Sequence, residues 1–80
     1  MTKSEYQLLF NQYEKELLKE QTLANEEKID LPRYYRNHHH YLLNKAIVMS
    51  NDFTPSIRNY RFRLAEDYIK EMIKICKESK

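Results

Sequence analysis

The residues best suited to chemistry in this chain gather in its middle. All five arginines and all three histidines lie between residues 31 and 63, together with four of the seven tyrosines. Arginine supplies a permanent charge and paired hydrogen bonds to carboxylates or phosphates. Tyrosine supplies a broad ring on which bases or side chains can stack. This composition indicates a surface that binds an anionic partner rather than a site that transforms a substrate.

Charge is segregated along the chain. Residues 1–30 hold four lysines against seven acids, a net charge of −3, whereas residues 31–63 hold five arginines and one lysine against Asp52 alone, a net charge of +5. Because Asp52 is the only acid in this basic block, paired-carboxylate catalysis has no candidate there. The whole chain carries a net charge of +2, which is modest for a dedicated nucleic-acid-binding domain. We therefore expect a protein partner to be favoured over nucleic acid.

Two parts of the basic block depart from simple amphipathic patterns. Arg58 and Arg61 extend the apolar half of the last expected helix, where a charge is costly unless it meets an anion or the core ends there. Tyr34, Tyr41 and Val48 recur every seven residues opposite the main apolar stripe of the middle helix, which suggests a second contact surface. The alternatives are that the arginines reach solvent or pair with the acidic first segment, and that the last helix covers the tyrosines. The candidate binding residues are Arg33, Tyr34, Arg36, Tyr41, Arg58, Tyr60, Arg61 and Arg63.

The histidine triplet at residues 38–40 does not have the spacing of a metal site. Zinc sites on helices place ligands at positions i and i+4, whereas consecutive side chains point about 100° apart. No acid or cysteine lies within a turn of the triplet, so we expect no metal and no other cofactor. His39 falls within the main apolar stripe and is expected to be a hydrogen-bonded core histidine. Cys76, the single cysteine, is expected to be a small buried apolar residue.

Arg33 and His38, separated by four residues, resemble the Arg-x4–6-His motif of HEPN-type ribonucleases. In that family the two residues lie in a helical domain and act on the RNA backbone, so the resemblance implies a catalytic role for this pair. The match covers six residues of a chain that is shorter than that fold, and Tyr34 stands where the family prefers a polar residue. With no glycine in the chain, a phosphate-cradling glycine loop is excluded. The sequence favours a protein without enzymatic activity.

Helices must position these residues. Eighty residues form a single domain, and the complete absence of glycine disfavours sheets and tight turns, which use it where φ is positive. Apolar residues recur at helical spacing in three segments, at about residues 3–24, 32–49 and 54–78. We expect an all-α fold, a small three-helix antiparallel bundle. The alternative is a helical hairpin that completes its core as a homodimer.

Each expected helix has a cap and an apolar side. The capping residues are Thr2 or Ser4, then Asp30, then Thr54. On the last helix the apolar arc from Leu64 onward covers about half of the circumference, which suits packing between the other two helices, or packing plus a dimer contact. The apolar stripe of the first helix consists of Tyr6, Leu9, Phe10, Tyr13, Leu17 and Ala24. The main stripe of the middle helix, expected to face the core, consists of Tyr35, Leu42, Leu43, Ala46, Ile47 and Met49.

The start of the chain has no apolar segment of signal-peptide length, and no run approaches the roughly 20 apolar residues of a membrane span. We therefore expect a cytoplasmic protein with no membrane contact. The many Lys, Asn, Ile and Tyr residues are typical of a short accessory protein from an AT-rich genome, such as a phage or mobile element carries. We expect a small regulatory protein that engages an acidic or nucleic-acid-handling protein, as modulator or inhibitor, through its Tyr- and Arg-rich surface. Direct DNA or RNA binding and a structural homodimer are the alternatives.

Overall fold

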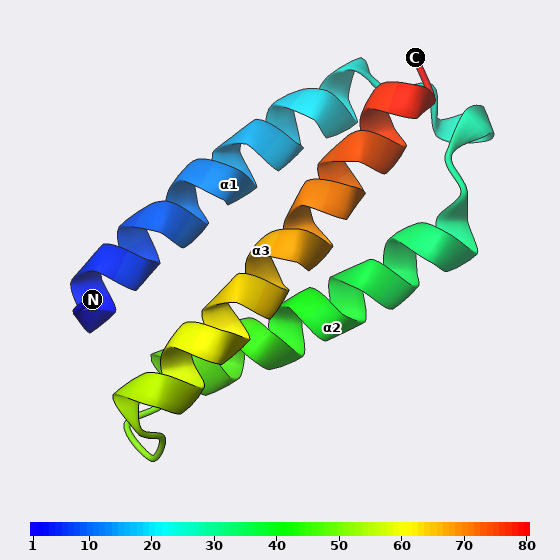
Figure 1. Ribbon diagram of the computed structural model, residues 1–80. Helices are drawn as coiled ribbons and strands as arrows, with labels where there is room; N and C mark the ends of the chain where they lie inside the picture. The colour runs from blue at the N-terminus through cyan, green and yellow to red at the C-terminus, as the bar shows by residue number, and fades with distance from the viewer.

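Three helices and one short turn make up the structure. The computed structural model describes residues 1–80. Helix α1 spans Lys3–Leu23, the 3₁₀ turn η1 spans Glu26–Lys28, α2 spans Leu31–Met49 and α3 spans Pro55–Glu78 (Figure 1). The three helices pack against one another, which confirms the predicted all-α three-helix bundle. Every helix boundary falls within one residue of its expected position.

Side chains that accept hydrogen bonds from exposed amides fix the start of each helix. The Glu5 amide donates to Thr2 Oγ1 at 3.2 Å, and the Thr2 amide donates to Glu5 Oε1 at 3.0 Å, a reciprocal capping box. Asp30 and Thr54 each accept the amide hydrogen three residues ahead, at 3.3 and 3.4 Å, where α2 and α3 begin. The caps expected at Thr2, Asp30 and Thr54 are therefore confirmed.

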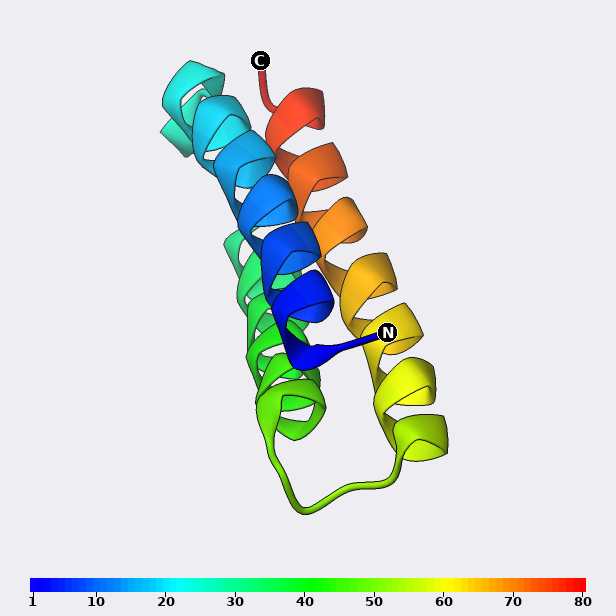
Figure 2. The same ribbon diagram turned by 90° about the vertical axis from the view of Figure 1, so that its left-hand side faces the viewer.

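Helices α1 and α3 run parallel, and α2 runs antiparallel to both. The ring of Tyr6, near the start of α1, lies 4.9 Å from the ring of Phe62. Beyond the other end of α1, the Asn25 amide donates to the Ser79 carbonyl oxygen at 3.2 Å. Helix α3 contacts α2 most extensively and also packs against α1, whereas α1 and α2 contact each other little. Figure 1 shows α3 between the other two helices, and Figure 2 shows the link by which the chain turns back from α2 into α3. The wide apolar arc of α3 thus packs against both other helices, which is the first of the two arrangements expected for it.

The core is centred on Phe10, which is fully buried. Its ring centroid lies 5.2 Å from that of Phe62 on α3 and 5.9 Å from that of Tyr41 on α2, so three aromatic rings join the three helices. Burying a side chain of this size stabilises the fold by about 1.5–3 kcal/mol. The other buried apolar residues are Tyr6, Leu17, Tyr34, Val48, Ala65, Ile69, Met72, Ile73, Ile75 and Cys76.

The buried side of α2 is the one that carries Tyr34, Tyr41 and Val48, which lies opposite the main apolar stripe. Tyr34, Tyr41 and Val48 are buried, whereas Tyr35 and Leu42 of the main apolar stripe are 60% and 49% exposed. The predicted core-facing side of α2 is therefore wrong. Of the two alternatives for Tyr34, Tyr41 and Val48, the structure has the one in which the last helix covers them. Both faces are apolar, but the two buried tyrosines carry hydroxyls that reach polar groups on α1. This face can be buried without losing hydrogen bonds.

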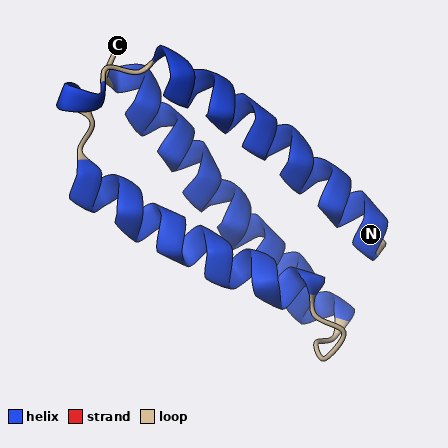
Figure 3. Ribbon diagram, turned by 180° about the vertical axis from the view of Figure 1, so that it is seen from behind, coloured by secondary structure: helices blue, strands red, loops and turns tan.

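The links between the helices are short and irregular (Figure 3). No residue in the chain has a positive φ, so no position requires glycine. In the first link, Asn25 caps η1 by accepting a hydrogen bond from the Glu27 amide at 3.1 Å. No helix has both the length and the apolar character to cross a lipid bilayer.

Candidate binding surfaces

Arg33 forms ion pairs with two carboxylates of α3. Its guanidinium contacts the carboxylate of Glu71 and lies 3.3 Å from that of Glu78, both on α3. The hydrogen bond to Glu71 is the main cause that raises the pKa of Arg33. His38, its neighbour in the Arg-x4-His spacing, is half-buried with its ring 6.2 Å from that of Tyr34. Arg33 thus fastens the start of α2 to the end of α3.

Arg58 and Arg61 fasten the other end of the same two helices. Arg58 Nη2 donates to the carbonyl oxygen of Ser50 at 2.5 Å, where α2 ends. A cation at this point also meets the negative end of the helix dipole. Arg61 Nη1 donates to Oδ1 of the buried Asn44 at 3.3 Å, while Asn44 Nδ2 donates to the His40 carbonyl oxygen at 2.7 Å.

These contacts explain why two arginines continue the apolar side of α3. The expected alternatives were solvent exposure or pairing with the acidic first segment. Instead both guanidinium groups bind polar groups of α2, and both side chains are half-buried. The sequence signal that could have revealed this is Asn44, a polar residue in register with Tyr41 and Val48 on the buried face of α2.

Tyr34 and Tyr41 lie inside the bundle and use their hydroxyls to hold α1. The Tyr41 hydroxyl donates to the Glu14 carboxylate, which also lies 2.6 Å from Lys45 Nζ. The Tyr34 hydroxyl accepts a hydrogen bond from the side-chain amide of Gln21. Burial, with the hydrogen bond to Glu14, raises the pKa of Tyr41 well above its usual value. These hydroxyls connect α1 to α2, which otherwise contact each other little.

The remaining three candidates are exposed but do not lie together. Tyr60 and Arg63 lie near the start of α3, and Arg36 lies near the start of α2. Because the Arg61–Asn44 hydrogen bond fixes the alignment of the two helices, Arg36 is about 12 Å along the axis from that level, at 1.5 Å per residue. The eight predicted residues therefore do not form one continuous surface.

A different surface stands out: the outward face of α2, defined here by Leu31, Tyr35, Leu42 and Leu43. These side chains are 48%, 60%, 49% and 50% exposed. At 100° per residue they fall within about 120° of the helix circumference. The exposed Arg36 and His39 lie on the same side of the helix. Tyr35, Leu42 and Leu43 belong to the stripe that was predicted to face the core.

The three histidines have different surroundings. The His40 ring stacks on that of Tyr68, with centroids 5.0 Å apart and planes at 18°. His39 is exposed, so the prediction that it is a core histidine is wrong. Its position follows from the orientation of α2, because His39 belongs to the face that turns outward. No group of three His, Cys, Asp or Glu side chains is placed to hold a metal ion.

Cys76 is buried, as predicted. Burial raises the pKa of its thiol, which keeps it protonated and apolar in character at neutral pH.

Compared with known proteins, the chain matches no family model, no curated protein and no solved structure.

Proposed function

We propose that this protein is a non-catalytic binding module. The outward face of α2 binds an amphipathic helix of a partner protein, and that helix carries acidic residues beside its apolar contact. The observation that carries the proposal is the apolar stripe itself. Leu42 and Leu43 stay half exposed although the opposite face of the same helix is sealed in the core. Grooves and faces of this kind recognise amphipathic helices through side chains at helical spacing.

The charge of α2 supports an acidic partner. The helix contains no aspartate or glutamate. Arg33 and Lys45 are already paired with carboxylates of α3 and α1. Arg36 makes no ion pair and is exposed beside the outward face. A partner that carries acids next to its apolar residues would complement Arg36, and charge complementarity of this kind sets partner choice.

The same charges disfavour a second copy of this chain as the occupant. A two-fold symmetric contact would place α2 against α2. Because α2 contains no acid, such a contact would offer Arg36 no carboxylate from the α2 of the partner copy. The homodimer alternative is therefore less well supported than a heterotypic partner. By binding a helix of its partner, a module of this size would act as a modulator or inhibitor.

A displayed library of amphipathic helical peptides tests the proposal. The library carries a constant apolar face and either acidic or basic flanking positions, and selection is performed on the immobilised full chain. We expect acidic-flanked peptides to be enriched, and Leu42→Asp to weaken their binding at least about tenfold, as loss of a central apolar contact does. Arg36→Glu should reverse the preference for acidic flanks.

Leu18→Asp is the matched control, since Leu18 is a 62% exposed leucine on α1, away from this face. It should leave selection unchanged. Enrichment of basic flanks, or selection that survives Leu42→Asp, would contradict the proposal.

Binding to labelled DNA and RNA over a salt series tests the nucleic-acid alternative. Its support is the exposed Tyr60, whose ring lies 5.9 Å from the Arg61 guanidinium, together with the exposed Arg63. We expect no tight binding at low salt. Tight binding that weakens steeply with salt would indicate several phosphate contacts, and would move the functional surface from α2 to the start of α3.

A further inference from the structure

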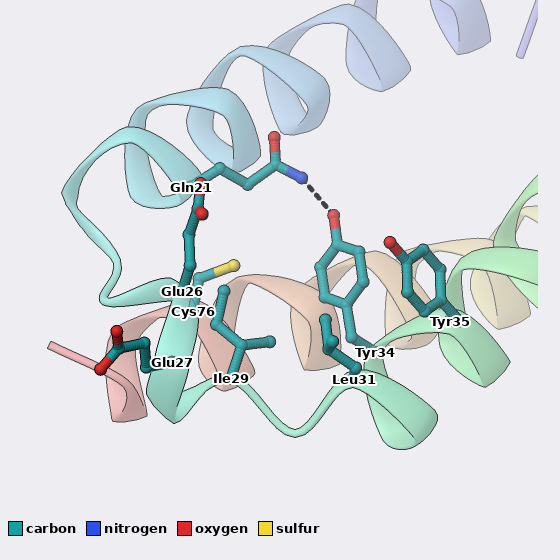
Figure 4. A pocket seen from close by; sticks show the side chains of 8 residues that line it. All are labelled: Gln21, Glu26, Glu27, Ile29, Leu31, Tyr34, Tyr35 and Cys76. Atoms are coloured by element: carbon teal, nitrogen blue, oxygen red, sulfur yellow. Dashed lines mark hydrogen bonds between the residues drawn. The ribbon is translucent and has the colours of Figure 1, made fainter.

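A cavity of about 610 Å³ opens at the end of the bundle where α1 gives way to η1. It lies between the end of α1, the η1 turn, the start of α2 and the last turns of α3 (Figure 4). Its volume is in the range of sites that hold small organic ligands, about 300–1,000 Å³. The lining residues are Gln21, Glu26, Glu27, Ile29, Leu31, Tyr34, Tyr35 and Cys76.

One part of the cavity wall is apolar and fixed by the fold. Cys76, from α3, is buried and directs its sulfur toward the cavity, while Ile29 approaches from the link before α2 and Leu31 from the first turn of α2 (Figure 4). Such a wall suits the hydrocarbon body of a ligand.

The aromatic part of the wall comes from Tyr34 and Tyr35. Their ring centroids are 5.7 Å apart and their planes meet at 84°. The hydrogen bond from Gln21 to the Tyr34 hydroxyl holds one of these rings in place. This is an edge-to-face pair, in which the edge of one ring meets the face of the other. The ring faces that remain open can attract a cation.

The charged side chains that line the cavity are all acidic. Glu26 and Glu27 are its only charged residues, and neither forms an ion pair within the chain. Figure 4 shows the Glu26 side chain extending along the cavity toward Gln21, whereas the Glu27 carboxylate points away from it. Of the two glutamates, only Glu26 therefore extends along the cavity.

We propose that this cavity binds an organic ammonium ion with an apolar body, its cationic group held by Glu26 and the tyrosine rings and its body against Ile29, Leu31 and Cys76. Two sources present this chemistry: a free small amine, and the methylated side chain of a lysine in another protein. Leu31 and Tyr35 belong both to this cavity and to the outward face of α2. The inference nevertheless goes beyond the proposed function, because it does not require a helix on that face.

An NMR titration of the full chain tests this inference. The probes are benzyltrimethylammonium, the uncharged benzyl alcohol and the anionic phenylacetate, and the readout is the chemical shift of the Ile29 and Leu31 methyl groups. We expect benzyltrimethylammonium to bind about tenfold more tightly than benzyl alcohol, a preference within the range of cation–π attraction. Phenylacetate should bind least.

The neighbouring glutamates provide a matched pair of variants. Glu26→Gln should lower the affinity for benzyltrimethylammonium several-fold and leave that for benzyl alcohol unchanged, whereas Glu27→Gln should have a smaller effect on either. Tyr35→Leu, at an exposed position that does not disturb the core, should reduce the preference for the cation. Equal affinity for the three probes, equal effects of the two glutamate variants, or no shifts at the cavity would overturn the proposal.

Two further arms complete the experiment. A peptide that contains trimethyllysine is compared with its unmethylated form, and the methylated form should bind more tightly if a protein supplies the ligand. Binding of benzyltrimethylammonium but of neither peptide would assign the cavity to a free amine. Leu42→Asp, which tests the proposed function, should leave the titration unchanged, so the two proposals can fail separately.

Discussion

The inner and outer faces of α2 both carry large apolar side chains, yet only the inner face is sealed against its neighbours. On the inner face, Tyr41 combines an aromatic ring in the core with a hydroxyl bonded to Glu14. On the outer face, Leu42 and Leu43 present only hydrocarbon and remain half exposed. The comparison teaches that apolar content alone does not select the buried face of a helix. Polar groups within that face must also find partners on the neighbouring helices.

The largest expected effect comes from placing a charge on each face in turn. Tyr41→Glu would bury a carboxylate next to Glu14 in place of a core ring, and we expect a loss of at least about 4 kcal/mol in the free energy of unfolding. That is enough to unfold a chain of this size under ordinary conditions. Leu42→Glu, the outer-face counterpart, should shift the free energy by no more than about 0.5 kcal/mol.

Urea unfolding followed by far-ultraviolet circular dichroism measures both variants. A cooperative transition of Tyr41→Glu close to that of the unmodified protein would reverse the assignment of the two faces.

A smaller effect is expected from the arginines that bind the inner face. Arg61→Ala leaves the side-chain oxygen of the buried Asn44 without a partner and should cost about 1–3 kcal/mol. Arg63→Ala removes an exposed side chain two residues away and should change stability by less than about 0.5 kcal/mol. The midpoint of thermal unfolding distinguishes them. Equal midpoints for the two variants would show that the Arg61–Asn44 contact contributes nothing.

The smallest effect concerns pH. Burial raises the pKa of Tyr41 in the folded protein, so the unfolded chain loses this proton first as pH rises through about 10. The resulting stabilisation is present below that pH and declines above it. Burial and the hydrogen bond to Glu66 raise the pKa of Tyr13 to about 12, which adds to the same alkaline decline.

Tyr41→Phe should therefore make the loss of stability between pH 10 and 12 shallower. At neutral pH it should cost about 1 kcal/mol through the lost hydroxyl contact. Denaturant unfolding at a series of pH values provides the measurement, with Leu43→Gln on the outer face as the control. If Tyr41→Phe leaves the dependence of stability on alkaline pH unchanged, the Tyr41 hydroxyl ionises equally in the folded and unfolded states.

The fold could be predicted because its signals are local. Thr2, Asp30 and Thr54 mark the helix starts through hydrogen bonds that span three residues. The wide apolar arc of α3 indicated two neighbours without any knowledge of their positions. These features depend on the chain near each residue, and sequence patterns describe that environment well.

The candidate surfaces could not be predicted in the same way, because they depend on contacts between distant residues. Which face of α2 is buried depends on Gln21 and Glu14 of α1. The role of Arg58 depends on the Ser50 carbonyl at the end of another helix. The cavity exists only where α1, η1, α2 and α3 meet, and no pattern in any one of them indicates it.

The parallel arrangement of α1 and α3 has a consequence for the order of folding. Helices α2 and α3 are joined by a short link and pair as a hairpin, so their contacts close a small loop and carry a low entropic penalty. The contacts of α1 with α3, such as Tyr6 with Phe62, close loops of more than fifty residues. Chains assemble their local contacts faster than their distant ones. The hairpin is therefore expected to form first, with α1 docking last and covering the face that carries Tyr41.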